Sequence, residues 1–302
     1  MPANIAELNE RCGIRDVVRF EPGPGGLTQI AVRAAGGEAA IALHGAHVLS
    51  YRLAGSKPVL WLSRHSWFEP GKPIRGGVPI CFPWFGPQAG DADAPPHGFA
   101  RLLEWQVERV SRRDDGSAEI VLLLASDERT ARWWPMDFEL RHRVRVGPCL
   151  TMALELRNRD SRPMPVELAL HSYFTVGNIP SVRVYGLTGV EYLDKVDSGR
   201  RKRDPEPAIR FTGETDRVYL DTTNTCVLDD PPLRRRITVD KLGSRSTVVW
   251  NPWAAKAARM SDFGDDEWPG MVCIETANVA DNALTLAPGA EHVMETAISV
   301  DS

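Results

Sequence analysis

The chain has 302 residues, of which 43% are hydrophobic and 25% are charged, and its formal net charge is −4. These values are ordinary for a globular protein with a sizeable core, and the lack of an overall positive charge argues against nucleic-acid binding. The five cysteines are scattered and form no C-x-x-C pair, which argues against both a disulfide framework and a zinc site.

In chain order, the first predicted element is a short amphipathic helix near residues 4–12. This stretch has no apolar signal-peptide core, and no run of 18 apolar residues follows that would span a membrane. We therefore expect a cytoplasmic protein whose partners include neither a membrane nor a nucleic acid.

Strand-like segments dominate the rest of the chain, and most are separated by Gly, Pro, Asp or Asn. Many strands with few short helices predict an all-β fold, a large antiparallel sandwich or barrel. No linker divides the chain, so we expect one domain over residues 1–302. The expected strands are 28–34, 38–43, 47–54, 58–62, 104–111, 118–125, 137–146, 150–158, 165–174, 235–240, 246–250, 271–277 and 291–300, with further short helices near 127–134 and 254–260.

Residues 63–101 differ in kind, because they combine seven prolines with tryptophan and phenylalanine. Proline cannot donate a hydrogen bond to a strand ladder, so a regular strand is excluded. A long, rigid, aromatic loop over a sheet is typical of a binding site. The alternative is a loop that only covers a sheet edge. Arg75, His97 and Arg101 interrupt the apolar run, which favours the binding site.

The predicted strand at 165–174 carries hydrogen-bonding side chains on one face. Successive strand residues point to opposite sides of a sheet, so His171 and Tyr173 share a face. The same face carries Glu167 and Ala169, and the other face carries Val166, Leu168 and Leu170. A packed core has no use for an imidazole, so this face is either solvated or the wall of a cleft.

Glu275 lies on a second unusual strand, where it shares a face with Met271 and Cys273. A carboxylate in such apolar company is a candidate for burial, which raises its pKa and is typical of a catalytic group. The alternative is a glutamate at a strand end that is solvated or paired with an arginine.

Taken together, these side chains favour one kind of chemistry. His171 and Glu275 offer an acid and a base, the two arginines offer positive charge for an anionic group, and tryptophan offers flat apolar faces for a sugar ring. The phosphate-loop, dinucleotide, nucleophile-elbow and H-E-x-x-H motifs are missing from the sequence. We therefore expect proton transfer on a carbohydrate, with no cofactor and no metal.

Eight sequence blocks support a more specific interpretation. They are HGAHVLSY (44–51), VLWLS (59–63), IRGGVPICFPWFG (74–86), HGFAR (97–101), LALHSYF (168–174), ETDRVY (214–219), VWNPW (249–253) and CIETAN (273–278). Together they resemble the aldose 1-epimerase (galactose mutarotase-like) superfamily, and within it the hexose-6-phosphate mutarotase group. The resemblance covers nearly the whole chain.

The resemblance implies a large antiparallel β-supersandwich and a reaction that interconverts the α and β anomers of an aldose. An acid protonates the ring oxygen while a base removes the C1 hydroxyl proton, and the opened ring closes to the other anomer. By resemblance, His171 is the acid and Glu275 the base, and we expect them on opposite sides of a bound pyranose.

The same resemblance implies a set of substrate-binding residues. They are His97 and Asp216 for the sugar, and Arg75 and Arg101 for a phosphate. Asp194 is a rival to Asp216. Some relatives have a glutamine just before the HG of HGFAR, where this chain has Pro96, so that contact is not expected here.

The leading hypothesis is glucose-6-phosphate 1-epimerase activity on a hexose 6-phosphate, carried out by a monomer. Two alternatives stay open: an aldose 1-epimerase that acts on unphosphorylated sugars, and a non-catalytic carbohydrate-binding protein of the same fold. A purely structural or interaction protein would not explain an interior histidine and glutamate on separate strands.

Overall fold

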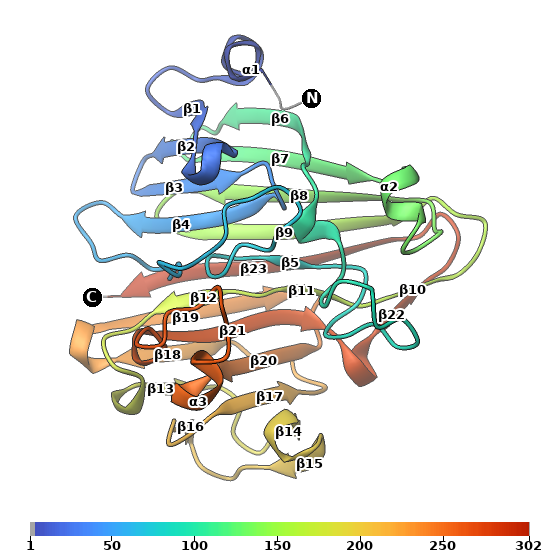
Figure 1. Ribbon diagram of the computed structural model, residues 1–302. Coiled ribbons are helices and arrows are strands. Elements are labelled where there is room, and N and C mark those ends of the chain that lie inside the picture. The colour runs from blue at the N-terminus through green and yellow to red at the C-terminus, as the bar shows by residue number, and fades with distance from the viewer. Residues whose placement is uncertain (1–3, 302) are drawn as a thin grey trace.

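The computed structural model describes residues 4–301, which form two large antiparallel sheets with smaller ones beside them (Figure 1). The nine-stranded sheet has the order β16 (Ala208–Ile209), β13 (Arg183–Tyr185), β18 (Cys226–Asp230), β19 (Arg235–Leu242), β23 (Glu291–Asp301), β9 (Leu150–Asn158), β8 (Phe138–Val146), β7 (Ala118–Ala125), β6 (Gln106–Arg112). The eight-stranded sheet has the order β15 (Arg200–Arg203), β14 (Glu191–Asp194), β17 (Thr215–Tyr219), β20 (Ser246–Asn251), β21 (Met271–Asn278), β11 (Leu168–Leu170), β5 (Ile80–Cys81), and β12 (Tyr173–Thr175) also pairs with β21.

The remaining elements are short. A four-stranded sheet comprises β1 (Val18–Pro22), β2 (Thr28–Ala34), β3 (Gly37–Ala42) and β4 (His47–Leu53), and β10 (Met164–Val166) pairs with β22 (Leu284–Leu286). The α-helices are α1 (Ile5–Cys12), α2 (Glu128–Ala131) and α3 (Trp253–Ala257). Single 3₁₀ turns are η1 (Pro24–Gly26), η2 (Ala100–Leu102), η3 (Ile179–Ser181), η4 (Lys195–Asp197), η5 (Pro231–Leu233), η6 (Trp268–Gly270) and η7 (Ala280–Asn282). The three predicted helices and the all-β class are confirmed.

The sequence of β8 shows why such strands form. Its residues alternate strictly between buried and partly exposed, as expected for a strand with one face on a core. On the outward face, Arg143 pairs with Glu155 of the neighbouring strand β9, and Arg141 pairs with Glu108 of β6, two strands away. The inward face joins the main hydrophobic core, which lies between the two large sheets and takes buried side chains from both.

Two predicted strands are organised differently from the expectation. Residues 58–62 form isolated bridges, Leu60 to Phe174 and Leu62 to Gly76, because this segment bonds to two different neighbours in turn. Residues 165–174 are divided among β10, β11 and β12. The chain leaves the ladder at Ser172, whose N–H bonds back to the carbonyl of Leu170 at 2.9 Å.

The other face of the eight-stranded sheet is covered by the segment 63–101 and by the residues that follow β20. Two smaller apolar clusters lie on this face, one around Trp61, Tyr173 and Phe263 and the other around Cys81 and Val248. The proline-rich segment forms only the two-residue strand β5 within the sheet, as its composition predicted. This covered face carries the polar groups described next.

Glycine allows the covering segment to pack closely on itself and on β4 of the four-stranded sheet. Gly98 has a φ of +73°, and a Cβ there would lie 1.9 Å from the carbonyl oxygen of Phe82. Gly77 has a φ of +59°, and a Cβ there would lie 2.3 Å from the carbonyl oxygen of Val48. These contacts explain the glycines beside Arg75 and His97, since any larger residue would push the segment away.

Candidate active site

The register of β11 and β12 on β21 brings His171 and Glu275 together. Leu170 pairs with Thr276 and Tyr173 pairs with Cys273, so the register is unchanged across the gap and His171 lies opposite Glu275. His171 Nε2 is 3.3 Å from Glu275 Oε1. The two groups therefore touch each other. They lie side by side on neighbouring strands of the sheet, and their expected placement on opposite sides of a bound pyranose stays a prediction.

Both members of this pair are buried, with His171 8% and Glu275 1% exposed. Burial, followed by the charges of Arg75 and Arg101, lowers the pKa of His171 well below its usual value. Burial and then the Asp216 carboxylate raise the pKa of Glu275 well above the usual value. Both shifts favour the uncharged forms, that is, a neutral imidazole beside a protonated carboxyl group.

Neither side chain is fully hydrogen-bonded. Within residues 4–301, His171 Nδ1 and Glu275 Oε2 are buried without a partner. Leaving a buried polar atom unpaired destabilises a fold by about 1–3 kcal/mol. Such groups cluster at sites where a ligand supplies the missing bonds.

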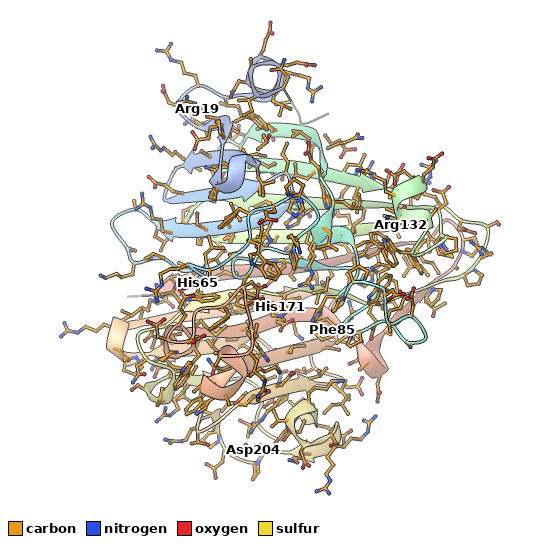
Figure 2. All side chains as sticks on the ribbon, in the orientation of Figure 1. Arg19, His65, Phe85, Arg132, His171 and Asp204 are labelled. Atoms are coloured by element: carbon orange, nitrogen blue, oxygen red, sulfur yellow. The ribbon has the colours of Figure 1, made fainter. Side chains whose placement is uncertain are left out.

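Aromatic rings fix the orientation of the imidazole. The ring of Tyr173 stacks on His171 with centroids 4.8 Å apart and an interplanar angle of 11°, and Trp61 stacks on the far side of Tyr173 at 5.7 Å. The edge of Trp250 meets both rings, at 6.2 Å and 5.9 Å. Figure 2 shows His171 near the centre of the molecule. Trp61 and Trp250 thus help hold the imidazole in place, and the stacking of a tryptophan on a sugar ring stays a prediction.

His97 approaches the pair from the covering segment. Its ring centroid is 5.8 Å from that of His171, and its backbone has a left-handed φ of +63°, which is uncommon outside glycine. The N–H of Gly86 donates to His97 Nδ1 at 3.3 Å, which leaves Nε2 as the protonated nitrogen. Burial, Arg101 and His171 lower the pKa of His97 well below its usual value, so it is a neutral donor.

The two predicted arginines are both near the pair but differ in their contacts. Arg75 donates through Nε and Nη2 to Asp262 Oδ2 at 3.2 Å and 3.0 Å, and through Nη1 to Tyr173 Oη at 3.0 Å. Arg101 is 8% exposed, and among the described residues its side chain donates only to the carbonyl of Pro96, at 2.8 Å. Its Nε has no partner within residues 4–301. Arg75 is thus compensated by a carboxylate, and Arg101 is not.

Asp216 lies on the opposite side of the pair from the covering segment. It faces Trp250 across β17 and β20, and its Oδ2 is 3.6 Å from Lys256 Nζ. Burial raises its pKa. Its rival Asp194 is held by Lys202 at 2.8 Å on β14, one strand further from the pair, so the structure favours Asp216.

Sequence reasoning missed two charged residues at this site, Asp262 and Lys256. Lys256 lies in the alanine-rich helix α3 and Asp262 in the loop that follows it, and neither stretch contains a recognisable motif. Their partners, Arg75 for Asp262 and Asp216 for Lys256, are far away in the sequence. No local signal would have found them.

Three side chains at the centre of the site have the donor atoms of a metal site. One ligand atom from each of His171, Cys273 and Glu275 lies within 4.8 Å of the others, and all three residues are buried. Burial and then the charge of Glu275 raise the pKa of the Cys273 thiol well above its usual value. The thiol is therefore protonated in the free site.

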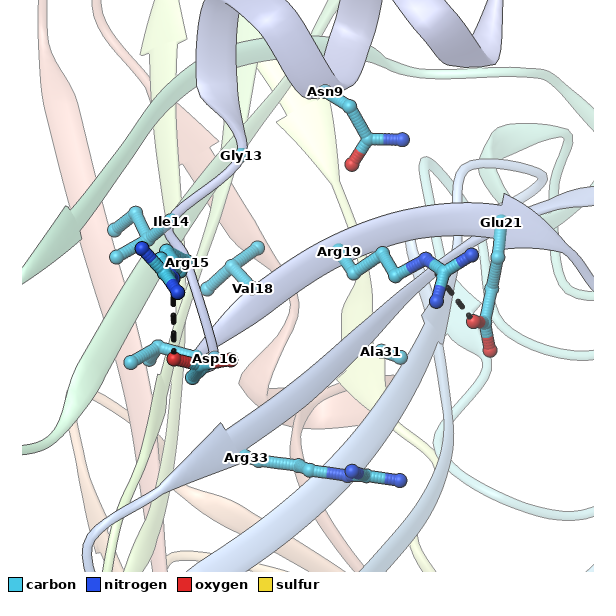
Figure 3. Close-up of a pocket in the computed structure, with 11 residues that line it drawn as sticks. Asn9, Gly13, Ile14, Arg15, Asp16, Val18, Arg19, Glu21, Ala31 and Arg33 are labelled. Atoms are coloured by element: carbon cyan, nitrogen blue, oxygen red, sulfur yellow. Dashed lines mark ion pairs between the residues drawn. The ribbon is translucent and has the colours of Figure 1, made fainter.

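A surface cavity of about 470 Å³ lies elsewhere, between α1, β1 and β2 (Figure 3). Its charged side chains either pair with each other, as Arg15 does with Asp16 and Arg19 with Glu21, or project from the sheet, as Arg33 does in Figure 3. The Arg15–Asp16 pair is 95% and 91% exposed. Among the described residues, its lining includes no buried titratable pair like that of His171 and Glu275. None of the helices within residues 4–301 has the length and apolar character needed to cross a membrane.

Known proteins resemble this chain over most of its length. A sequence model described as aldose 1-epimerase matches residues 28–299. A protein of Salmonella typhimurium named "Putative glucose-6-phosphate 1-epimerase" is 40% identical over 239 residues, which is 79% of each chain. A protein of the same name from Cenchrus ciliaris is 37% identical over 277 residues, 89% of this chain and 83% of the relative.

Solved structures show the same fold. The crystal structure of a "putative mutarotase" (YeaD) from Salmonella typhimurium superimposes with a TM-score of 0.89 at 36% identity, covering 96% of this chain and 95% of that one. A galactose 1-epimerase from Lactobacillus acidophilus superimposes with a TM-score of 0.73, covering 94% of this chain and 98% of that one. Its 14% identity is evidence of a shared fold alone.

Proposed function

Because this chain belongs to the aldose 1-epimerase family and is an isomerase, we propose that it interconverts the α and β anomers of a hexose 6-phosphate. The observation that carries the proposal is the buried contact between His171 and Glu275, 3.3 Å apart. A pair that holds one proton presents one donor and one acceptor at adjacent positions. Anomer exchange needs such a pair, because the C1 hydroxyl oxygen and the ring oxygen are bonded to the same carbon.

In the proposed reaction, Glu275 accepts the proton of the C1 hydroxyl while His171 donates a proton to the ring oxygen. The C1–O5 bond breaks, the aldehyde rotates about C1–C2, and reclosure reverses both proton transfers. The resting proton prefers Glu275, but the 3.3 Å contact allows it to move to His171 as substrate binds. Arg101 assists this step, because its charge favours the carboxylate form of Glu275.

Arg101 is the proposed main contact for the 6-phosphate. It is a buried cation without a carboxylate within ion-pair distance among the described residues, and a dianionic phosphate would supply that charge. The names of the curated relatives point to the same substrate class. Arg75 is a weaker candidate for the phosphate contact than the sequence suggested, because its guanidinium already forms an ion pair with Asp262.

We propose that His97 and Asp216 orient the sugar ring between them. His97 offers a neutral N–H from the covering segment, and Asp216 offers a carboxylate from β17. Trp250 lies beside His171 and Tyr173 and offers its indole to the apolar side of the sugar. His97 would donate a hydrogen bond to a sugar hydroxyl and Asp216 would accept one. Variants at the two positions should therefore differ in which aldoses they still accept.

Anomer exchange measured by NMR tests the proposal. Magnetisation transfer between the α and β signals of glucose 6-phosphate, with and without protein, should show a large acceleration, and galactose should show a smaller one. Equal acceleration of galactose would favour the aldose 1-epimerase alternative. Binding of either sugar without acceleration would leave the carbohydrate-binding alternative and end the catalytic proposal.

We further propose that the chain is one domain and acts as a monomer in the cytoplasm. The main core draws on residues from Leu8 to Ile298, which supports a single domain. All five cysteines are free thiols, which supports a reducing compartment. Light scattering would test the monomer, since a dimer would double the mass from 33.4 kDa.

A further inference from the structure

The centre of the site contains a buried thiol, Cys273, that anomer exchange does not use. Cys273 and Glu275 are two positions apart on β21, so their side chains point to the same face, and His171 lies beside them on the neighbouring strand. The three ligand atoms lie within 4.8 Å of one another. Cys273 itself is 0% exposed and takes no part in the proposed proton transfers.

These donor atoms match one class of metal ion. A thiolate, an imidazole and a carboxylate are common ligands of zinc, and zinc sites with three protein ligands keep a fourth position open. Soft cations such as Cd²⁺ prefer thiolate ligands more strongly than Zn²⁺ does, whereas Mg²⁺ and Ca²⁺ prefer oxygen ligands. Two buried atoms at this place, His171 Nδ1 and Glu275 Oε2, have no partner within residues 4–301. The site thus contains polar atoms that a ligand would satisfy.

We propose that a thiophilic divalent cation, represented by Zn²⁺ or Cd²⁺, binds at His171, Cys273 and Glu275 and excludes the sugar from the acid–base pair. The thiol and the carboxyl each lose a proton to solvent, and the imidazole binds through a ring nitrogen. Two new negative charges balance the dication. The complex therefore adds no net charge beside Arg75 and Arg101, which would otherwise oppose a bare cation.

Binding is tested with Cd²⁺, followed through the ultraviolet charge-transfer absorption of a cadmium–thiolate bond. The parent protein carries Cys12→Ser and Cys149→Ser, which remove the two partly exposed thiols. We expect one equivalent of Cd²⁺ to bind, and Cys273→Ser to abolish the absorption. Cys226→Ser is the matched control, because Cys226 is equally buried but lies on β18 of the other large sheet.

Glu275→Gln provides a second test that keeps the thiol. It should weaken Cd²⁺ binding at least tenfold without abolishing the absorption, because one of three ligands loses its charge. Thermal unfolding of each variant checks that it is folded. The proposal would be overturned if the parent protein gave no cadmium–thiolate absorption. It would also be overturned if the absorption survived Cys273→Ser, or if Cys226→Ser reduced it equally.

Inhibition is the part that rests on the proposed function. With free Zn²⁺ fixed by a metal buffer, anomer exchange should fall as the site fills, and raising the hexose 6-phosphate concentration should restore it. Metal binding without any anomer exchange would refute the proposed function and leave the metal site. Anomer exchange that Zn²⁺ and Cd²⁺ leave unchanged would refute the metal site and leave the function.

Discussion

His171 Nε2 lies 3.3 Å from Glu275 Oε1, and this polar contact joins the two side chains. It arises because β11 and β12 keep one register along β21. The remaining polar atoms of the pair, Nδ1 and Oε2, are buried without partners. A fold selected for stability alone would place apolar side chains here, so the pair is evidence of function.

Removing either group of the pair should abolish most of the activity. We expect Glu275→Gln and His171→Asn each to slow anomer exchange of glucose 6-phosphate by roughly 10²–10⁴-fold, the usual contribution of a general acid or base. The measurement is magnetisation transfer by NMR. Glu119→Gln is a matched control, because Glu119 is a buried glutamate on β7 that pairs with Arg109. Wild-type rates in either site variant would show that the assigned role is wrong.

Glu275→Gln should also stabilise the protein, and more so at higher pH. The pKa of Glu275 is raised in the folded state, so above the unfolded value of about 4.3 the folded state holds a proton that the unfolded state has lost. Stability then falls as pH rises. Glutamine removes this dependence. The melting temperature of the variant should exceed that of the wild type by more at pH 8 than at pH 5, and the opposite order would contradict the raised pKa.

Activity should depend on pH through the proton count of the pair. The reaction needs one shared proton, so it fails at low pH when His171 also becomes protonated, and at high pH when the pair loses its proton. Burial lowers the pKa of His171 and raises that of Glu275. We therefore expect the acid limb well below pH 6.5 and the alkaline limb well above pH 4.5. An acid limb at or above pH 6.5 would indicate an ordinary, solvated histidine.

The fold class and the two central residues could be predicted from the sequence, but the residues around them could be predicted only in part. Alternation along strands such as β8 is a local signal, and so is a histidine within an apolar run. The short strands β13 to β18 were missed, because two to five residues carry too little periodicity. The direct contact of His171 with Glu275 depends on strand register, and the Arg75–Asp262 pair depends on tertiary packing. Neither relationship is encoded by spacing along the chain.

Arg101 should decide the preference for a phosphorylated sugar. Hydrogen bonds to a charged group contribute about 1.5–3 kcal/mol, so Arg101→Met should raise KM for glucose 6-phosphate roughly 10–150-fold and change exchange of free aldoses much less. Arg101→Lys keeps the charge and should retain part of the preference. Because Arg101 is a buried cation without a carboxylate partner, the methionine variant should be at least as stable as the wild type. An equal loss for both kinds of sugar would contradict a phosphate contact.

Arg75 cannot be tested alone, because it is one half of a buried ion pair. Asp262 is 6% exposed at its side chain and lies 3.0 Å from Arg75 Nη2. Arg75→Ala would leave this carboxylate unpaired, at a cost of about 3–5 kcal/mol in unfolding free energy. We expect Arg75→Met combined with Asp262→Asn to recover most of that loss, since neither buried charge is then left without a partner. Urea unfolding of the two single variants and the double variant measures the coupling. If the two losses simply add, the pair does not stabilise this wall of the site, and the contact between Arg75 and Tyr173 must be maintained by packing alone.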